Sequence, residues 1–288
     1  MEIIKDEEGF GGLVDNLFVG EVPQVRGNLS IQFTGTGNVL YCEKGVKLAG
    51  TIRFPGSNSV ICLRKSRHVL RMNLTAYNNC IISIGKGNYF NGNLNAIASE
   101  ERAIVIGDKG LFSFGIWIRT ADPHLIYDCD TNMRNNPSRD VLIGDHVWIG
   151  QDALIMKGST IGSGSIIGGK AVVAGKTVDS NSVWGGNPAK CLKRGIFWDE
   201  PSVHAYTAEQ TAASQHFESD KYKFKESAET VSMKDLLQEV RSVDDAEERF
   251  RLLKKNLFQG GLNNRFFIPS PQPKPQEPNR NRLFGKRG

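Results

Sequence analysis

Residues 143–173 read IGDHVW IGQDAL IMKGST IGSGSI IGGKAV V, and this stretch decides the fold. Every sixth residue from Ile143 to Val173 is aliphatic, and the residue after it is small in five of six cases. A period of six fits neither an amphipathic helix nor an alternating strand. It is typical of a β-helix, in which each six-residue unit makes one short strand and one corner, and three units close a triangular coil. We therefore predict a mainly β chain, built as a parallel β-helix: a triangular prism of hexapeptide repeats.

The six-residue spacing continues upstream of this stretch, with one long interruption. Ile106, Phe112 and Ile118 keep the period, but the next aliphatic residue in register, Ile143, follows Ile118 by 25 residues instead of six. The excess predicts a loop that leaves the prism at about residues 119–140. A long excursion from a rigid solenoid is more often functional than accidental.

Three cysteines lie in the earlier, less regular repeats. Cys42, Cys62 and Cys80 are 20 and 18 residues apart, close to the length of one coil. We expect them to stack as small side chains inside the prism. The chain has five cysteines and no CxxC pair, so neither a disulfide framework nor a zinc site is indicated.

Changes in sequence pattern divide the chain into four segments. The first is polar and Gly-rich and is predicted to be an irregular lead-in, and the last is Pro-rich and basic. The third contains apolar residues at helical spacing over 232–258, with a second helix expected to start near Ser242. The segments are the N-terminal lead-in at 1–27, the β-helix domain at 28–195, a partly helical extension at 196–268, and the tail at 269–288.

Charge is unevenly distributed along the chain. The net charge is +5, but Arg249–Gly288 holds ten Lys or Arg residues and one acidic residue, Glu277. A near-neutral body with a basic tail is not the pattern of a nucleic-acid binder. The tail is interpreted either as a solvated terminus or as an electrostatic tether to an anionic polysaccharide or a membrane surface. We expect a cytoplasmic protein, because the chain has no transmembrane run of about 18 apolar residues and no apolar signal segment.

Three motifs carry a likeness to a known family. The run Ile143–Gly150 (IGDHVWIG), the repeats after it and Gly186–Lys190 (GNPAK) resemble the hexapeptide-repeat acyltransferases, whose left-handed parallel β-helix binds acetyl-CoA. Residues 118–127 (IRTADPHLIY) are similar to the His-bearing loop of members that O-acetylate sugars. The likeness is greatest to the capsule and lipopolysaccharide branch, which includes sialic-acid and polysialic-acid O-acetyltransferases, and Phe197–Trp198 also fits that branch. The resemblance implies an acetyl-CoA-dependent O-acetyltransferase, acting in a bacterial cytoplasm on a sugar hydroxyl of a capsular or surface polysaccharide.

Acetyl transfer to a hydroxyl needs a general base and donors for the oxyanion, and no covalent enzyme intermediate. His124, on the long loop, is the candidate base. Asp122 either holds the imidazole tautomer or serves as an Asx-turn residue before Pro123. The resemblance implies that Trp148 lines the acetyl and pantetheine channel and aids the oxyanion; the alternative is a packing residue at a trimer interface. His146 is the rival base.

Coenzyme A needs backbone contacts for its pantetheine arm and cations for its phosphates. Gly168 and Gly169 would let the arm approach the backbone closely, and the family's pattern maps further contacts onto Gly169 and Ala174. No metal is expected, because a third ligand cannot be assembled from the repeat. The available cations are Lys170, Lys176, Lys190, Lys193 and Arg194.

Family members are usually homotrimers with CoA between neighbouring prisms, which implies that Trp148 and Lys176 serve a site whose His124 comes from the adjacent subunit. Two alternatives stay open. One is an acetyltransferase for a small acceptor, such as a nucleotide-sugar amine, an antibiotic or an amino acid. The other is a non-catalytic β-helix scaffold. Phe197–Trp198 and the segment after them either cover the acceptor cleft or cap the open end of the prism, and a cap is the default.

Overall fold

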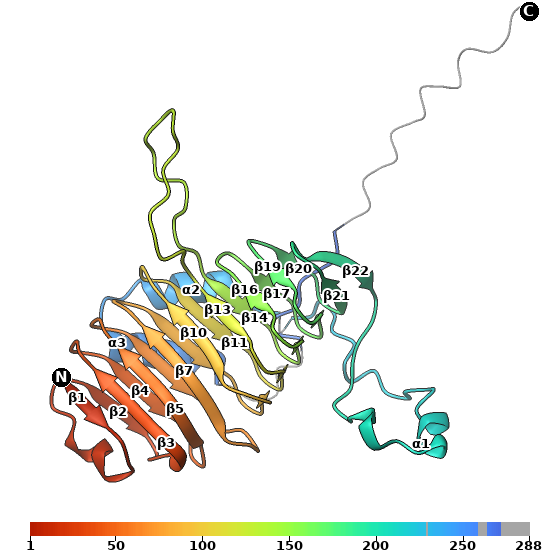
Figure 1. Ribbon diagram of the computed structural model, residues 1–288, viewed down its shortest axis with the longest axis horizontal. Helices are drawn as coiled ribbons and strands as arrows, with labels where there is room; N and C mark the ends of the chain where they lie inside the picture. The colour runs from red at the N-terminus through yellow and green to blue at the C-terminus, as the bar shows by residue number, and fades with distance from the viewer. Residues whose placement is uncertain (229, 259–263, 272–288) are drawn as a thin grey trace, which may run out of the picture.

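The computed structural model describes residues 1–228, 230–258 and 264–271. The chain forms the parallel β-helix that the repeat predicts, with the left hand that the family resemblance implies, as a prism with three sheet walls and a long projecting loop (Figure 1). From residue 272 onward the predicted Pro-rich basic tail lies outside the described residues.

Each wall of the prism is a ladder of short strands, one from each coil. Successive strands within a wall pair in parallel, except that β1 and β22 pair antiparallel with their neighbours. Wall A comprises β1 (Glu2–Ile4), β3 (Gln24–Phe33), β5 (Lys47–Phe54), β7 (Leu70–Ala76), β10 (Leu94–Ala98), β13 (Trp117–Arg119), β16 (Leu154–Ile155) and β19 (Val172–Val173). Wall B comprises β2 (Leu17–Gly20), β4 (Val39–Cys42), β6 (Val60–Leu63), β8 (Ile81–Ile84), β11 (Ala103–Ile106), β14 (Val141–Ile143), β17 (Thr160–Ile161) and β20 (Thr177–Val178). Wall C comprises β9 (Tyr89–Phe90), β12 (Leu111–Phe112), β15 (Trp148–Ile149), β18 (Ile166–Ile167), β21 (Ser182–Gly185) and β22 (Lys190–Arg194).

The aliphatic residue of each repeat points into the prism. All six that define the period, from Ile143 to Val173, are fully buried. Each buried aliphatic side chain contributes roughly 1.5–3 kcal/mol by leaving water. The small residue that follows has a steric reason: a Cβ at Gly150 would lie 2.5 Å from the Gly169 nitrogen, and one at Gly144 would lie 2.7 Å from the Ser163 nitrogen. The period of six is therefore set by the filled interior and by the crowded corner.

The cysteine prediction is wrong for one of the three residues. Cys42 and Cys80 lie in the prism interior, but Cys62 lies on the outer face of wall B. In the β4–β6 pairing, Cys42 stands beside Leu63 and Tyr41 beside Cys62. The spacing of 20 residues is one short of the local coil, and neighbouring residues on a strand face opposite sides.

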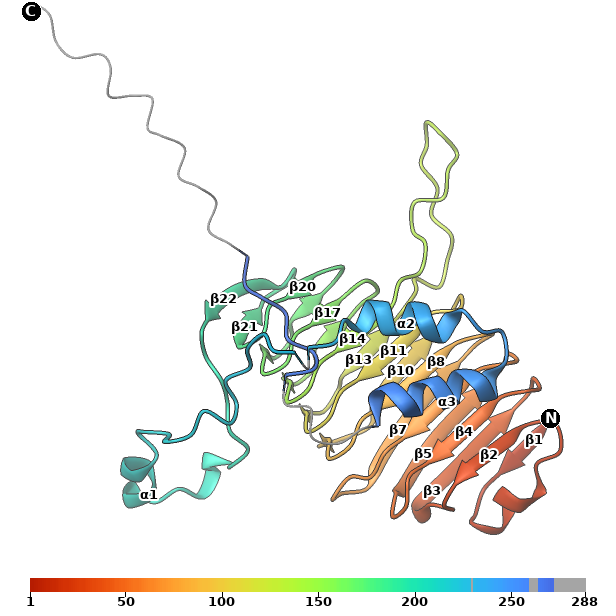
Figure 2. The same cartoon turned by 180° about the vertical axis from the view of Figure 1, so that it is seen from behind.

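Two helices cover wall B (Figure 2). They are α2 (Met233–Arg241), capped by the Ser232 side chain, and α3 (Ala246–Leu257), capped by Asp245, so the predicted helices and the break near Ser242 are confirmed. Their apolar faces pack against the outward side chains of wall B; for example, the Phe250 ring lies 5.0 Å from that of Tyr41. These helices cover a wall of the prism rather than its open end, unlike the default expectation.

Buried arginines fasten this extension to the prism. Arg265 donates to both carboxylate oxygens of Asp145 at 2.7 and 2.8 Å, and Arg249 donates to the Asn58 and Asn79 carbonyls at 3.0 and 3.3 Å. Arg241, which is only partly buried, pairs with Asp140 at the end of the projecting loop. Because a buried charge whose partner is removed is strongly destabilising, these contacts fix the extension in one position.

Residues 1–27 contain strands and a 3₁₀ helix, so they do not form the irregular lead-in that the composition indicates. Strands β1 and β2 pair with β3 and β4, and β3 itself starts at Gln24. The 3₁₀ helix η1 (Glu8–Gly12) buries Phe10, whose ring packs 4.7 Å from that of Phe18. None of the helices within the described ranges is both long and apolar enough to cross a membrane.

Candidate active site

The projecting loop leaves the prism at the corner between walls A and B. Strand β13 ends at Arg119 and β14 begins at Val141, which confirms the predicted excursion at about 119–140. We call residues 120–140 the extruded loop. A single bridge pairs Tyr127 with Arg134 partway along it. The loop therefore stands off the prism as a narrow two-stranded arm (Figure 1).

Ion pairs fasten the base of the extruded loop to the prism. Arg134 donates to both carboxylate oxygens of Glu100 at 2.7 and 2.9 Å. These bonds, with one from Ser138, lower the pKa of Glu100 to about 2. On the other side, Lys157 lies 2.5 Å from Asp122 and lowers the pKa of that carboxyl. The loop base is thus held on two coils at once.

The backbone of His124 is held by a hydrogen bond, whereas its side chain is not. The buried Asn136 amide donates to the His124 carbonyl at 2.8 Å and to Asp122 at 3.1 Å, and its oxygen accepts from the Ile126 N–H at 2.9 Å. The His124 imidazole is exposed and has no hydrogen-bond partner among the described residues. An exposed, positioned imidazole is what a general base for an incoming hydroxyl requires.

Asp122 makes no hydrogen bond to the His124 ring among the described residues; its Oδ2 accepts from Lys157 and from Asn136. The expected role of Asp122 as the group that orients His124 therefore has no hydrogen bond to support it here. The sequence patterns did not identify Asn136 as a residue of the site. The pattern that could have drawn attention to it is the Asn-Pro pair at 136–137, which marks a turn.

A cavity of about 300 Å³ lies beside His124. Its floor comes from wall A, through Tyr77, Ile97 and Arg119, and its rim from Asp122 and His124. The candidate base therefore faces a hollow on the wall A side of the prism.

Trp148 lies on a different wall. It sits on β15 of wall C, points outward and is 39% exposed. In register it stands between Leu111 and Ile166, which also point outward. Trp148 does not line the cavity beside His124. A single chain thus keeps the two main candidate residues apart.

Gly168 and Gly169 lie at the corner between walls C and A. A Cβ at either position would make only ordinary contacts, at 3.5 Å from the Trp184 carbonyl and at 3.4 Å from the Gln151 carbonyl. Packing therefore does not demand glycine here, unlike at Gly150. The bare backbone leaves room for a ligand outside the prism.

The candidate phosphate-binding cations do not form one cluster. Lys170, at the C–A corner, pairs with Asp152 at 3.1 Å, and Ala174 and Lys176 are exposed at the A–B corner, where the extruded loop also leaves. Lys190 and Arg194 lie on β22, where the Arg194 Nε lies 2.9 Å from the buried Asp179 carboxylate. Lys176 and Lys190 keep side chains without an ion-pair partner among the described residues.

His146, the rival base, is buried inside an aromatic stack. Its ring lies between those of Trp198 and Tyr222, at centroid distances of 3.9 Å on both sides. Nε2 donates to the Trp198 carbonyl at 3.0 Å, and burial lowers the pKa of the imidazole. At 2% exposure His146 cannot reach a substrate, so it is a structural residue. It fastens residues 197–224, which we call the strap, to the corner between walls B and C.

The strap is expected to loosen in acid. Because the pKa of folded His146 is lowered, its neutral stack is fully stable above the ordinary value of about 6.5, and stability falls as pH drops from there toward the folded pKa. Glu200 and Lys221 are the charged groups that act on the ring, and they oppose each other. The protection factors for hydrogen exchange of residues 197–224, which correct for the slower intrinsic exchange in acid, are expected to be lower at pH 5.5 than at pH 7.5. His146→Phe keeps an aromatic ring and removes the titration, so an unchanged pH effect in this variant would contradict the assignment.

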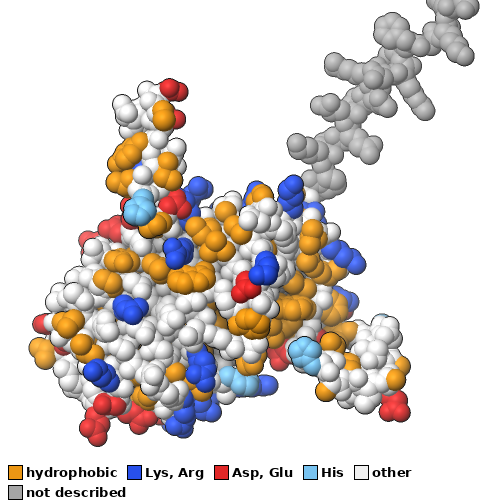
Figure 3. All heavy atoms as spheres, viewed as in Figure 1, with side chains coloured by type: hydrophobic (Ala, Val, Ile, Leu, Met, Phe, Trp, Pro, Cys, Tyr) orange, Lys and Arg blue, Asp and Glu red, His pale blue; other side chains and the backbone are white. Residues whose placement is uncertain are grey.

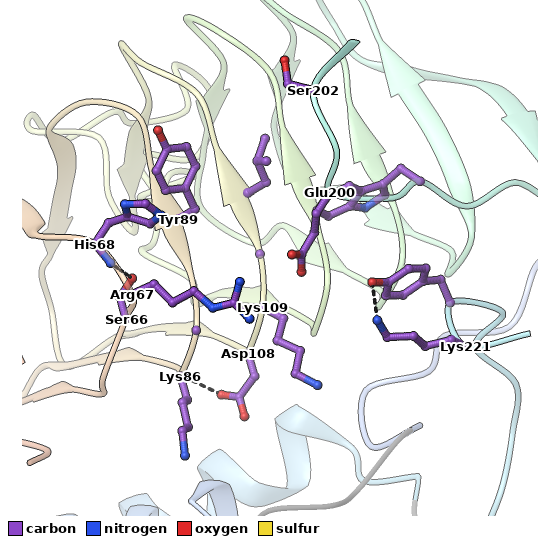
Figure 4. Close-up of a pocket in the computed structure, with 15 residues that line it drawn as sticks. Ser66, Arg67, His68, Lys86, Tyr89, Asp108, Lys109, Glu200, Ser202 and Lys221 are labelled. Atoms are coloured by element: carbon purple, nitrogen blue, oxygen red, sulfur yellow. Dashed lines mark hydrogen bonds between the residues drawn. The ribbon is translucent and has the colours of Figure 1, made fainter. Parts of the chain in front are cut away.

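A second, larger cavity of about 620 Å³ lies between the strap and the B–C corner (Figure 4). Arg67, Lys86 and Lys109 line it from three successive coils, and Glu200 and Lys221 line it from the strap. The strap carries two short helices, η2 (Val203–Ala205) and α1 (Ala208–Ala213), and projects away from the prism between its two attachments (Figure 1). No sequence pattern indicates this cavity, because the strap has no repeat period.

Apolar side chains remain exposed on walls A and C and on the extruded loop (Figure 3). Helices α2 and α3 cover wall B only. On wall A, Trp117, Leu154 and Val172 lie side by side on neighbouring strands, paired in register. Four large apolar side chains of the extruded loop are at least half exposed: Leu125, Ile126, Tyr127 and Met133.

Within residues 1–228, 230–258 and 264–271, no three His, Cys, Asp or Glu side chains converge as metal ligands would.

The chain is similar to several known proteins. Residues 140–175 match the family model described as bacterial transferase hexapeptide (six repeats). A polysialic acid O-acetyltransferase of Neisseria meningitidis is 36% identical over 172 residues, which cover 59% of this chain and 80% of that protein. Another, from Escherichia coli O1:K1 / APEC, is 40% identical over 102 residues, 35% of this chain and 33% of that protein.

Two solved structures share the fold. The polySia specific acetyltransferase NeuO matches with a TM-score of 0.54 at 26% identity, over 69% of this chain and 93% of that chain. The polysialic acid O-acetyltransferase OatWY matches with a TM-score of 0.54 at 24% identity, over 68% of this chain and 97% of that chain.

Proposed function

Because this chain belongs to the hexapeptide-repeat acyltransferase family that includes the polysialic acid O-acetyltransferases, we propose that it transfers acetyl from acetyl-CoA to a sugar hydroxyl of a bacterial capsular polysaccharide. The observation that carries the proposal is the match to 80% of the N. meningitidis enzyme. The reaction takes place in the bacterial cytoplasm, which supplies acetyl-CoA. The β-helix at 28–195 is the catalytic domain in this proposal.

The chemistry needs one base and one oxyanion donor. His124 takes the proton of the sugar hydroxyl as that oxygen attacks the thioester carbonyl. The tetrahedral intermediate carries its negative charge on the former carbonyl oxygen, toward which the indole N–H of Trp148 donates. The intermediate then collapses, the C–S bond breaks, and the CoA thiolate leaves and takes the proton from His124.

The exposed apolar surfaces support a homotrimer in which wall A of one subunit faces wall C of the next. A heterologous contact of this kind closes into a ring when its rotation fits. The ring brings together the cavity beside His124, on the wall A side, and Trp148, on the neighbour's wall C. The apolar extruded loop packs across the junction. The acetyl transfer site is then shared by two subunits.

CoA enters this junction along the later coils. Gly168 and Gly169 present bare backbone to the pantetheine arm, and Ala174 lies at the next corner. Lys176 shares the A–B corner with the extruded loop, and Lys190, on β22, also lacks an ion-pair partner in the described part of the chain. Lys170 and Arg194 contribute less in this proposal, because Asp152 and Asp179 already pair with them.

The proposal is tested by acetyl-CoA turnover. Free thiol release is measured with the full chain and a panel of acceptors: capsular polysaccharides, sugar monomers, nucleotide-sugar amines and amino acids. Release that depends on a polysaccharide is expected. Release with a small amine alone would favour the small-acceptor enzyme, and no release with any acceptor would contradict the proposed reaction.

A further inference from the structure

The larger cavity is continuous with the proposed point of acetyl transfer. On wall C, Tyr89 pairs in register with Leu111, and Leu111 pairs with Trp148. Strands in one wall are about 4.8 Å apart, so Leu111 and Tyr89 lie one and two coils before Trp148. Both line the larger cavity, as does Trp198, whose ring lies 6.1 Å from that of Trp148. An acceptor that reacts beside Trp148 can therefore extend directly into the cavity.

The cavity carries an excess of unpaired positive charge. Arg67, Lys86 and Lys109 line it with exposed side chains that have no ion-pair partner in the described part of the chain. Asp108 also lines it, but two arginines, Arg64 and Arg265, lie 3.2 Å from its carboxylate oxygens. These two arginines therefore already balance the negative charge of Asp108.

The strap adds one cation and one carboxylate. Lys221 donates to the Tyr222 hydroxyl at 2.7 Å, and Glu200 is the carboxylate that faces the prism across the cavity (Figure 4). One carboxylate does not balance Lys221 together with the three cations of the prism. A carboxylate ligand would therefore meet a net positive cavity.

Aromatic side chains supply the rest of the lining. The Tyr89 ring meets the His68 ring edge-on at 4.5 Å, and Trp198 and Tyr222 close the opposite side. Aromatic faces pack well against the apolar faces of sugar rings, whereas cations bind carboxylates. The combination fits a ligand that presents both, such as a sugar acid.

We propose that this cavity binds carboxylate-bearing sugar residues of the acceptor polymer, next to the residue that is acetylated beside Trp148. The inference rests on the proposed function and deepens it, because it makes the acceptor an anionic polymer rather than a neutral or monomeric sugar. The candidate CoA contacts at Gly168, Gly169 and Lys176 lie after Trp148 along the chain, on later coils. The earlier coils are thus left for the acceptor, and the strap forms one wall of its cleft.

The test is the double variant Arg67→Gln/Lys109→Gln in the full chain, with polysialic acid oligomers of graded length as the acceptor. The KM for long oligomers is expected to rise about tenfold, the loss from two charge-assisted contacts, while kcat and the KM for acetyl-CoA stay within about twofold. The difference from the unmodified chain is expected to shrink for the shortest oligomers and at high salt. Arg26→Gln/Lys44→Gln makes the same charge change on exposed residues outside the cavity, and is expected to change nothing.

Two kinetic outcomes would overturn the inference. A higher KM for acetyl-CoA with an unchanged KM for the oligomer would assign the cavity to the CoA phosphates. No change in either constant would remove the cavity from substrate binding.

Calorimetric binding of the same oligomers to His124→Ala separates this inference from the proposed function. Weaker binding after Arg67→Gln/Lys109→Gln in that background would support the cavity even if no turnover is found. Equal binding would overturn it even if turnover is found.

Discussion

His124→Ala is expected to lower kcat/KM by about 10²- to 10⁴-fold, the usual contribution of a positioned general base. The side chain is exposed and has no partner in the described part of the chain, so its removal leaves no buried group unpaired. Thermal unfolding and the oligomeric state should therefore be unchanged. The measurement is acceptor-dependent thiol release from acetyl-CoA over a range of acceptor concentrations, which gives kcat/KM.

A matched control is His204→Ala, which removes another exposed histidine, on the strap. Its activity is expected to match that of the unmodified chain. If His124→Ala kept more than about a tenth of the activity, the base would have to be another group. His146 would not qualify, because it is sealed between Trp198 and Tyr222.

The prism was predictable because its information is local. Each repeat places one aliphatic residue inside and one small residue at a crowded corner, and the same rule holds from Ile143 to Val173. The extruded loop followed from the same rule, since a break in a strict period has a definite length and place. The two helices followed from their apolar spacing and from the polar caps Ser232 and Asp245.

Contacts between distant segments were not predictable in this way. Cys62 faces outward because the local coil is one residue longer than the distance from Cys42 to Cys62, which the spacing alone did not reveal. Asp122 forms its ion pair with Lys157, 35 positions later, and not with the His124 ring. The strap has no period, so neither its stack on His146 nor the basic cavity beneath it left a pattern in the sequence.

The choice between enzyme and scaffold also needed more than the repeat. A filled prism with capped helices is equally compatible with an enzyme and with a scaffold, because the six-residue period reflects how side chains pack and carries no information about a reaction. The alternative of a non-catalytic scaffold is wrong, since the chain belongs to a family of acyltransferases. The roles of the active-site residues remain a proposal. Whether that site is divided between two subunits can be measured directly.

Mixing two inactive variants is expected to restore activity if that division is right. His124→Ala lacks the base, and Trp148→Ala lacks the residue proposed to aid the oxyanion, a loss of about 10²- to 10³-fold for donors of this kind. An intact site needs His124 from one subunit and Trp148 from its neighbour. Every ring of three that contains both variants supplies that pair at one of its three sites, so about one third of the original activity should return in the mixed assemblies.

Co-expression of the two variants with different tags, followed by purification through both tags, gives the mixed assemblies to be assayed. The matched control pairs His124→Ala with the double variant His124→Ala/Trp148→Ala, in which no subunit carries the base, and it is expected to stay inactive. If the mixed assemblies were no more active than the separate variants, both residues would have to serve from one chain. That outcome would conflict with their positions on the extruded loop and on wall C, and would require the extruded loop to fold back from the place where Asn136 and Lys157 hold it.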